Sequence, residues 1–145
     1  MTATEYVIEA LGGPKVFKGR TAPTATELRD RVRTGLPYQS LESIRERLNL
    51  TLPEAAVVLH VPLRTLARRR HGRRLDADES DRLYRLARIA AQAVGVLGTD
   101  EKAATWLRRP NRALNGEVPL ALLDTDLGAR QIEEVLGRIE HGVVS

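Results

Sequence analysis

Apolar residues recur along this chain at intervals of three and four, the spacing that places them on one face of a helix. Leu41, Ile44 and Leu48 follow this spacing, and a longer series extends from Leu83 to Leu97. No segment alternates convincingly between apolar and polar residues, as the strands of a half-buried sheet do. The pattern therefore predicts an all-α fold.

Helix start and stop signals divide the chain into segments. Thr24–Glu27, Thr51–Glu54 and Asp76–Glu79 each place a capping side chain three residues before a glutamate, which is typical of a helix N-terminus. Gly35 and Gly98 stand where helices are expected to end. We expect helices over residues 5–11, 24–35, 37–48, 51–59, 63–70, 76–97, 99–107 and 125–141, with a short one from residue 119. The best domain boundary follows Gly98, which gives domains 1–98 and 99–145.

Residues 51–70 have the layout of a helix-turn-helix. Ala56 is small where two helices must approach closely, Val61 fills the inner side of the turn, and Leu66 faces inward from the second helix. His60 and Pro62 depart from the usual pattern, which has a glycine in the turn and a Ser or Thr cap on the second helix. The second helix of such a motif can lie in the major groove of DNA.

Charge is unevenly distributed, although the net charge is only +4. From Arg64 to Arg74 there are six arginines and no acid, whereas residues 117–145 hold six acids and two arginines. A basic middle and an acidic end suggest two different partners.

The basic segment supplies the candidate DNA contacts, because arginines can reach phosphates or guanine edges. The candidates are Arg64, Thr65, Arg68, Arg69, Arg70, Arg73 and Arg74. Of these, Arg64, Thr65, Arg68 and Arg69 are expected to face outward from the second helix. The alternative is that the segment is a helical core module with a solvated arginine face.

The C-terminal region interleaves turn signals with large apolar residues, as a compact helical module does. Pro110 is expected to break a helix, Asn111 can cap the next turn of the chain, and Asn115–Gly116 supplies a turn with positive φ. Trp106, the only tryptophan, is either a core residue or an interface hot spot. The final helix carries one apolar stripe, formed by Ile132, Val135, Leu136 and Ile139.

The sequence contains no recognisable catalytic or metal site. His60, His71 and His141 are scattered, and the chain has no cysteine. Ser80 and Asp81 are adjacent, so on a helix they diverge by about 100° and cannot act as nucleophile and base. A glycine-rich phosphate loop, an apolar run of about 20 residues and a secretory signal are all missing. We therefore expect a cytoplasmic protein without catalysis, cofactor, metal or membrane partner.

Two groups of residues closely resemble one family of bacterial proteins. The first runs from Trp106 to Gly116, continues through Val118–Thr125 and ends at Arg138–Gly142. The second comprises Thr65–Arg70, Leu75 and Glu79–Leu83, preceded by Gly35–Pro37 and Leu41. Both are similar to the Xre/MbcA/ParS-type antitoxins, the partners of RES-domain toxins in toxin–antitoxin pairs.

The resemblance implies an N-terminal Xre-like helix-turn-helix domain followed by a small helical toxin-binding domain. It implies that the C-terminal region docks on a RES-domain toxin and blocks its NAD pocket, and that the complex represses its own operon by binding operator DNA. The toxin-binding candidates are Trp106, Arg130, Glu134, Arg138, Glu140, His141, Val144 and Ser145. A sharper hypothesis places the Ser145 carboxylate where a phosphate of NAD would otherwise bind. The alternative is a tail that only frays.

Two other functions fit the same residues. One is an ordinary helix-turn-helix repressor whose C-terminal module only dimerises, and the other is a ParS-type scaffold that binds a partner without DNA or toxin. A homodimer is expected from the long apolar helix between Leu83 and Leu97 and from the two-fold symmetry of operator-binding helix-turn-helix proteins.

Overall fold

The computed structural model describes residues 1–18 and 23–142, and within them the chain forms eight α-helices, three short 3₁₀ helices and no strand. The α-helices are α1 (Ala3–Ala10), α2 (Ala25–Thr34), α3 (Tyr38–Leu48), α4 (Leu52–Leu59), α5 (Leu63–Arg69), α6 (Ala77–Leu97), α7 (Asp100–Arg108) and α8 (Asp126–Glu140). The 3₁₀ helices are η1 (Gly13–Lys15), η2 (Arg112–Leu114) and η3 (Pro119–Leu122). The all-α prediction is confirmed, and the expected α-helices lie within two residues of their expected bounds.

Local capping signals set these helix bounds. The side chains of Thr24, Thr51 and Asp76 each accept a hydrogen bond from the backbone N–H three residues later, and the glutamate there accepts one from the backbone N–H of the capping residue. α2 and α6 end at glycines whose φ is positive, 103° at Gly35 and 106° at Gly98. The sequence signals therefore predict where helices begin and end, because each depends only on neighbouring residues.

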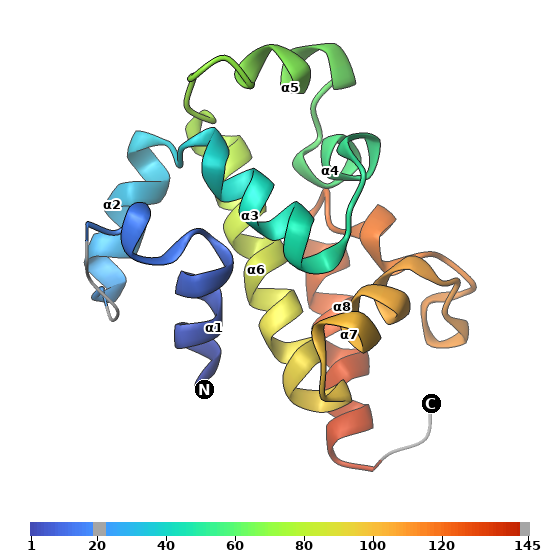
Figure 1. Cartoon of the computed structure of the whole chain (residues 1–145). Coiled ribbons are helices and arrows are strands. Elements are labelled where there is room, and N and C mark those ends of the chain that lie inside the picture. Colours follow the sequence, from blue (N-terminus) through green and yellow to red (C-terminus); the bar gives the residue numbers. More distant parts are fainter. Residues whose placement is uncertain (19–22, 143–145) are drawn as a thin grey trace.

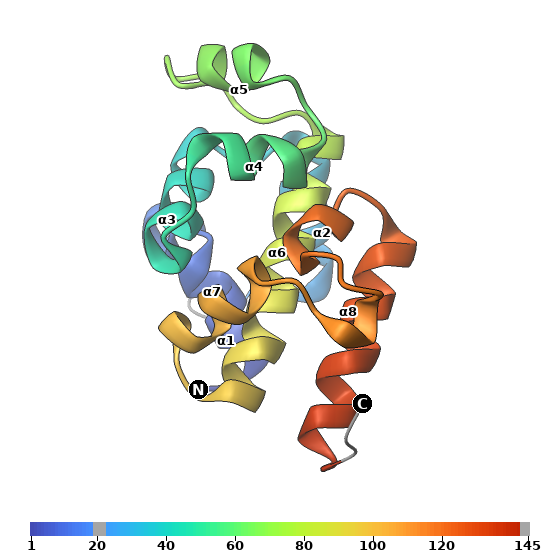
Figure 2. The same cartoon turned by 90° about the vertical axis from the view of Figure 1, so that its right-hand side faces the viewer.

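α6 is the central element of the fold, and it contacts α1, α2, α4, α7 and α8 (Figure 1, Figure 2). Its apolar residues are buried against these neighbours, including Leu83, Leu86, Ala87, Ile89, Ala90 and Ala93. The apolar face of α6 is thus covered within the chain. This face is therefore no longer evidence for the expected homodimer, because a dimer interface needs an exposed surface.

The core is continuous across the expected domain boundary. Leu107 and Leu136 lie beyond Gly98 in the sequence, yet they belong to the same buried cluster as Leu83 and Leu41. The chain therefore has one shared core, and the boundary after Gly98 stays a prediction.

An ion pair ties α7 to the start of α4. Arg108 donates from Nε to Glu54 Oε2 at 3.0 Å and from Nη2 to Glu54 Oε1 at 2.9 Å, and it also donates to the carbonyl of Asn49. The hydrogen bond from Arg108 lowers the pKa of Glu54 below its ordinary value. Because Glu54 also closes the capping box of α4, this pair fixes the helix N-terminus to α7.

The first turn of α8 lies directly against the backbone of η3. A Cβ atom added at Gly128 would stand 1.9 Å from the carbonyl oxygen of Leu122, whereas one added at Gly137, in the same helix, would meet nothing within 4 Å. Only glycine therefore allows this close approach.

We predict that Gly128→Ala lowers the free energy of unfolding by about 1–3 kcal/mol, because the methyl group forces the two backbones apart. Gly137→Ala is the matched control, and it should leave stability unchanged or raise it by about 0.5–1 kcal/mol through its higher helix propensity. Urea denaturation followed by circular dichroism measures both. Equal stability of the two variants would contradict the close contact.

A second prediction concerns Glu54 and pH. Its folded pKa is depressed, so its ion pair stabilises the protein above the unfolded pKa of about 4.3 and this stabilisation is lost as pH falls through the folded pKa. We expect Glu54→Gln to lower the free energy of unfolding by about 1 kcal/mol at pH 7. The deficit should shrink as the pH falls below about 4.

The matched control is Glu117→Gln, since Glu117 is exposed and its side chain has no partner among the described residues. Denaturation curves collected between pH 7 and pH 3 compare both variants with the parent. A deficit at Glu54→Gln that does not change with pH would show that the carboxylate charge contributes nothing.

Candidate functional site

The turn between α4 and α5 tolerates both departures from the usual helix-turn-helix pattern. His60 adopts the left-handed conformation with φ 55° and ψ 48°, the region that the turn normally reserves for glycine. Pro62 is the N-cap residue of α5 and supplies no capping side chain, so the first backbone N–H groups of this helix receive no hydrogen bond from the cap, although the fixed φ of proline suits a helix start. Leu66 is fully buried beneath α5. The helix-turn-helix geometry is therefore formed without the usual residues.

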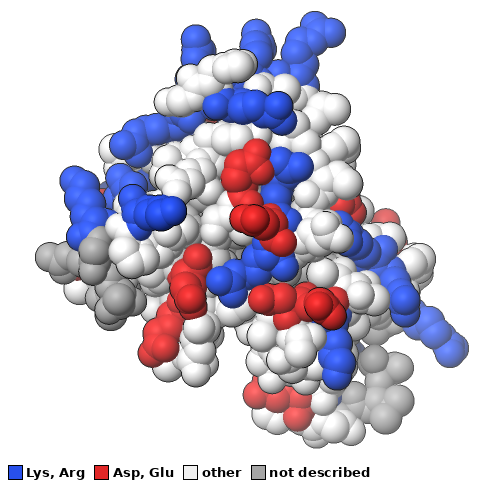
Figure 3. Space-filling model, viewed as in Figure 1, with Lys and Arg blue, Asp and Glu red and all other residues white. Residues whose placement is uncertain are grey.

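α5 lies at one end of the molecule and presents a basic surface to solvent. Arg64 and Arg68 are exposed on it, Arg70 and Arg73 follow it in the chain, and none of their side chains is paired with a described residue. Thr65 is half-buried. Lys and Arg side chains line the top of the molecule over α5, while acidic side chains gather nearer its centre and lower half (Figure 3). Unpaired arginines on a protruding helix are free to meet an anionic partner.

Arg69 differs from the expectation that it faces outward. Its Nη2 lies 3.1 Å from Oε2 of Glu79, whose side chain is 2% exposed, and 3.7 Å from Oδ2 of Asp76. A buried carboxylate needs such a partner, because an unpaired charge in the interior is costly. Arg69 therefore holds α5 against the start of α6, and its role as a DNA contact stays a prediction.

Arg74 also makes a contact within the chain. Its Nη1 donates to the carbonyl of Gly35 at 3.0 Å, and the backbone N–H of Leu75 donates to the carbonyl of Leu36 at 2.9 Å. These bonds attach the segment after α5 to the end of α2. The candidate DNA contacts thus divide into an outward group and two arginines with structural partners. The sequence analysis assigned Glu79 only a capping role, and only the fold brings Arg69 to it.

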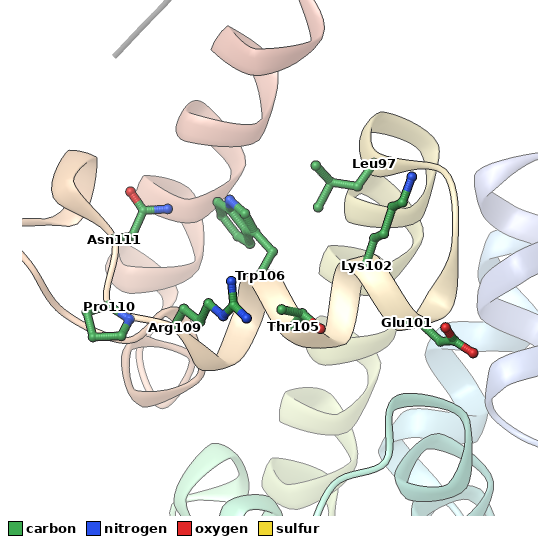
Figure 4. Close-up of a pocket in the computed structure, with 8 residues that line it drawn as sticks. All are labelled: Leu97, Glu101, Lys102, Thr105, Trp106, Arg109, Pro110 and Asn111. Carbon is green, nitrogen blue, oxygen red and sulfur yellow. The ribbon is translucent and has the colours of Figure 1, made fainter.

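Trp106 lies in the last turns of α7, and its side chain lines a groove on the surface of the molecule. The side chain is half-buried, packs against the core and lines a depression of about 550 Å³. In Figure 4 its indole ring stands between Asn111 on one side and Leu97 and Lys102 on the other. Both interpretations of this residue therefore remain open, because it packs against the core and also lines an open groove.

α8 presents a separate candidate surface. Five of the candidate toxin-binding side chains lie on α8 or directly after it, and all five are exposed to solvent. They are Arg130, Glu134, Arg138, Glu140 and His141. Glu134, Arg138 and His141 line one shallow hollow with Gly137, whereas Arg130 pairs with Asp126 at 2.9 Å. Trp106 lines a different depression. Val144 and Ser145 lie outside the described residues.

Two apolar side chains of α8 extend beyond the core. Leu127 is 76% exposed and Ile139 is 37% exposed, while Ile132, Val135 and Leu136 are buried. Three of the four residues of the apolar stripe are therefore buried, and Ile139, in the last turn of α8, is the exposed one. Leu127 lies five residues before Ile132 and so about 140° away from it around the helix, which places it off the apolar stripe, but it was not selected from the sequence.

Other kinds of site find no support within residues 1–18 and 23–142. No group of three or more potential metal ligands comes together there. None of the helices in this part of the chain is long and apolar enough to cross a bilayer.

Comparisons with known proteins match both halves of the chain. Residues 27–88 match the antitoxin Xre-like helix-turn-helix domain, and residues 90–142 match the antitoxin Xre/MbcA/ParS C-terminal toxin-binding domain. A protein of Yersinia enterocolitica described as antitoxin Xre is 35% identical over 129 residues, which are 88% of this chain and 87% of that protein.

Two further proteins described as antitoxin Xre agree with this match. That of Photorhabdus laumondii is 35% identical over 113 residues, covering 77% of this chain and 76% of that protein. That of Pseudomonas putida is 38% identical over 117 residues, covering 80% of this chain and 72% of that protein.

The two matched domains indicate two kinds of partner. A helix-turn-helix domain implies DNA binding and a toxin-binding domain implies a toxin partner. Proteins of this kind inhibit and regulate, and they are not enzymes. The expectation of a non-enzymatic protein therefore agrees with the family. With both domains matched and relatives aligned over most of its length, the chain belongs to the Xre antitoxin family.

Proposed function

We propose that this antitoxin belongs to a type II pair, inhibits a RES-domain toxin that degrades NAD, and represses its own operon through α4 and α5. The C-terminal region would cover the active site of the toxin. The observation that carries the proposal is the separation of two surfaces on one shared core. The basic α5 lies at one end of the molecule, and the last turn of α8 lies at the other (Figure 1).

This separation supports simultaneous binding of toxin and operator. The operator would occupy α5 and the toxin would occupy α8, so neither partner would block the surface that the other uses. DNA binding by the arginines of α5 would rest on charge, so it should weaken steeply as the salt concentration rises. A homodimer is also part of the proposal, because two copies would bind a two-fold symmetric operator more tightly than one.

Electrophoretic mobility shift assays on the operon's own promoter test the DNA surface. The double substitution Arg64→Gln with Arg68→Gln should weaken binding at least about tenfold, and it should reduce the slope of log K against log salt by about 2. Each lost contact between an arginine and a phosphate leaves one counterion fewer to be released on binding.

Arg69→Gln is the contrasting variant. It should reduce the free energy of unfolding by about 1–3 kcal/mol, because buried Glu79 loses a partner, while the folded protein keeps the salt slope of the parent. Unchanged affinity in the Arg64 and Arg68 double variant would overturn the proposed role of α5.

Co-expression with the neighbouring RES-domain reading frame tests the toxin surface, with growth and cellular NAD as readouts. The triple substitution of Glu134, Arg138 and His141 by Ala should weaken toxin binding at least about tenfold and restore toxicity. Removal of residues 142–145 should do the same if the terminal carboxylate contributes.

Arg112→Ala is the control for these variants, since Arg112 lies on η2 and is not among the residues that line the hollow of α8. Full neutralisation by both the triple variant and the truncated chain would move the toxin contact away from α8. A chain that represses but never neutralises or co-purifies with the toxin would instead be an ordinary repressor.

A further inference from the structure

α2 is the least covered helix of the fold. It contains no buried residue, and its apolar side chains Leu28 and Val32 are only half-buried, with Leu28 packed against the core. Between α2 and α6 lies a groove of about 440 Å³, whose apolar lining includes these two residues and half-buried Tyr84. An apolar groove with an aromatic side chain in it is typical of a protein-binding surface.

The two walls of this groove carry opposite charges. Arg29 and Arg33 lie on the α2 wall, and Asp78 and Asp81 lie on the α6 wall. Within the described residues, Arg33 and Asp78 have no ion pair or side-chain hydrogen bond.

The other two charged residues pair only with neighbours on their own helices. Arg29 pairs with Asp30 at 3.4 Å and Asp81 with Arg85 at 3.9 Å. The Arg29–Asp30 pair is exposed and contributes little. The Asp81 side chain is 64% exposed beside the more buried Arg85, so both groove charges can still meet a partner.

A surface with a positive strip beside a negative strip is complementary to itself. Rotation by 180° about an axis perpendicular to the interface places the α2 wall of one copy against the α6 wall of the other. We infer that the α2–α6 groove is the surface through which two copies of this chain form a symmetric dimer. Arg29 and Arg33 of each copy would then face the aspartates Asp78 and Asp81 of the other, and the apolar linings of the two grooves would cover one another.

Charge complementarity is what selects a second copy as the occupant. DNA is poorer, because the arginines of α2 would attract phosphates but Asp78 and Asp81 on the opposite wall would repel them. A uniformly acidic or uniformly basic partner would meet the same conflict at one wall. A second copy presents a basic wall and an acidic wall at the same distance from one another, so each wall of the groove meets a wall of opposite charge.

The position of α5 agrees with this arrangement. α2 ends and α6 begins near the end of the molecule where α5 lies, and the segment after α5 is bonded to Gly35 and Leu36 there (Figure 1). The groove and the basic surface are therefore joined through a short bonded segment. This interface belongs to the homodimer of the proposed function, but its test needs neither toxin nor operator.

Analytical ultracentrifugation of the full-length protein tests the interface. The parent should be a dimer at micromolar concentrations. Arg29→Asp with Arg33→Asp makes both walls acidic, and Asp78→Lys with Asp81→Lys makes both walls basic. Each double variant should dissociate at least about tenfold more readily, because like charges then face one another. An equimolar mixture of the two should recover a dimer, since acidic walls then meet basic walls.

Arg64→Asp with Arg68→Asp is the control, with an equal charge change on α5. It should lose DNA binding and keep the dimer, so failure of the DNA proposal and failure of the interface remain distinguishable. Circular dichroism must show that each variant is folded.

Two kinds of result would overturn the inference. The first is a parent that stays monomeric, or a dimer that neither double variant weakens. The second is a mixture that stays monomeric while both variants are folded. Loss of DNA affinity in the Arg29 and Arg33 variant without any change in mass would assign those arginines to phosphate contacts instead.

Discussion

Burial of the apolar face of α6 is the constraint on which the other features depend. The helix carries leucine, isoleucine and alanine side chains into the core, so five helices can pack around it at close range. A chain with 3% aromatic residues has few large side chains with which to fill a core. It fills the core instead by surrounding one long helix, and this arrangement leaves α5 and the outer face of α8 with few contacts to the interior.

Two arginine–glutamate pairs complete the attachment of the peripheral elements. Glu79 uses one oxygen to cap α6 and the other to hold Arg69, while Glu54 caps α4 and holds Arg108. In both cases one glutamate satisfies a helix N-terminus and anchors a second element. The result is that the positions of α5 and α7 are each tied to a helix start, where backbone N–H groups already favour a negative charge.

The sequence predicted what depends on near neighbours and missed what depends on the assembled fold. Capping boxes, terminal glycines and the positive φ at Asn115 are local, and all of them appear as expected. Long-range partners are different. The position of Arg69 in the sequence did not show that its side chain would pair with Glu79. The apolar series of α6 did not show that other helices of the same chain would cover this face. The candidate toxin contacts were placed on α8 by resemblance, and the fold adds that exposed Leu127 lies in the first turn of the same helix.

The matched domains meet between residues 88 and 90, in the middle of α6. A helix cannot be cut at its centre without exposing the core that surrounds it. Neither half of this antitoxin can therefore be expected to survive alone, and a protease that cut within α6 would destroy both surfaces in the same event. For a protein of the proposed function, degradation would free the toxin and the promoter together, so that resynthesis of the antitoxin begins when its inhibition of the toxin ends.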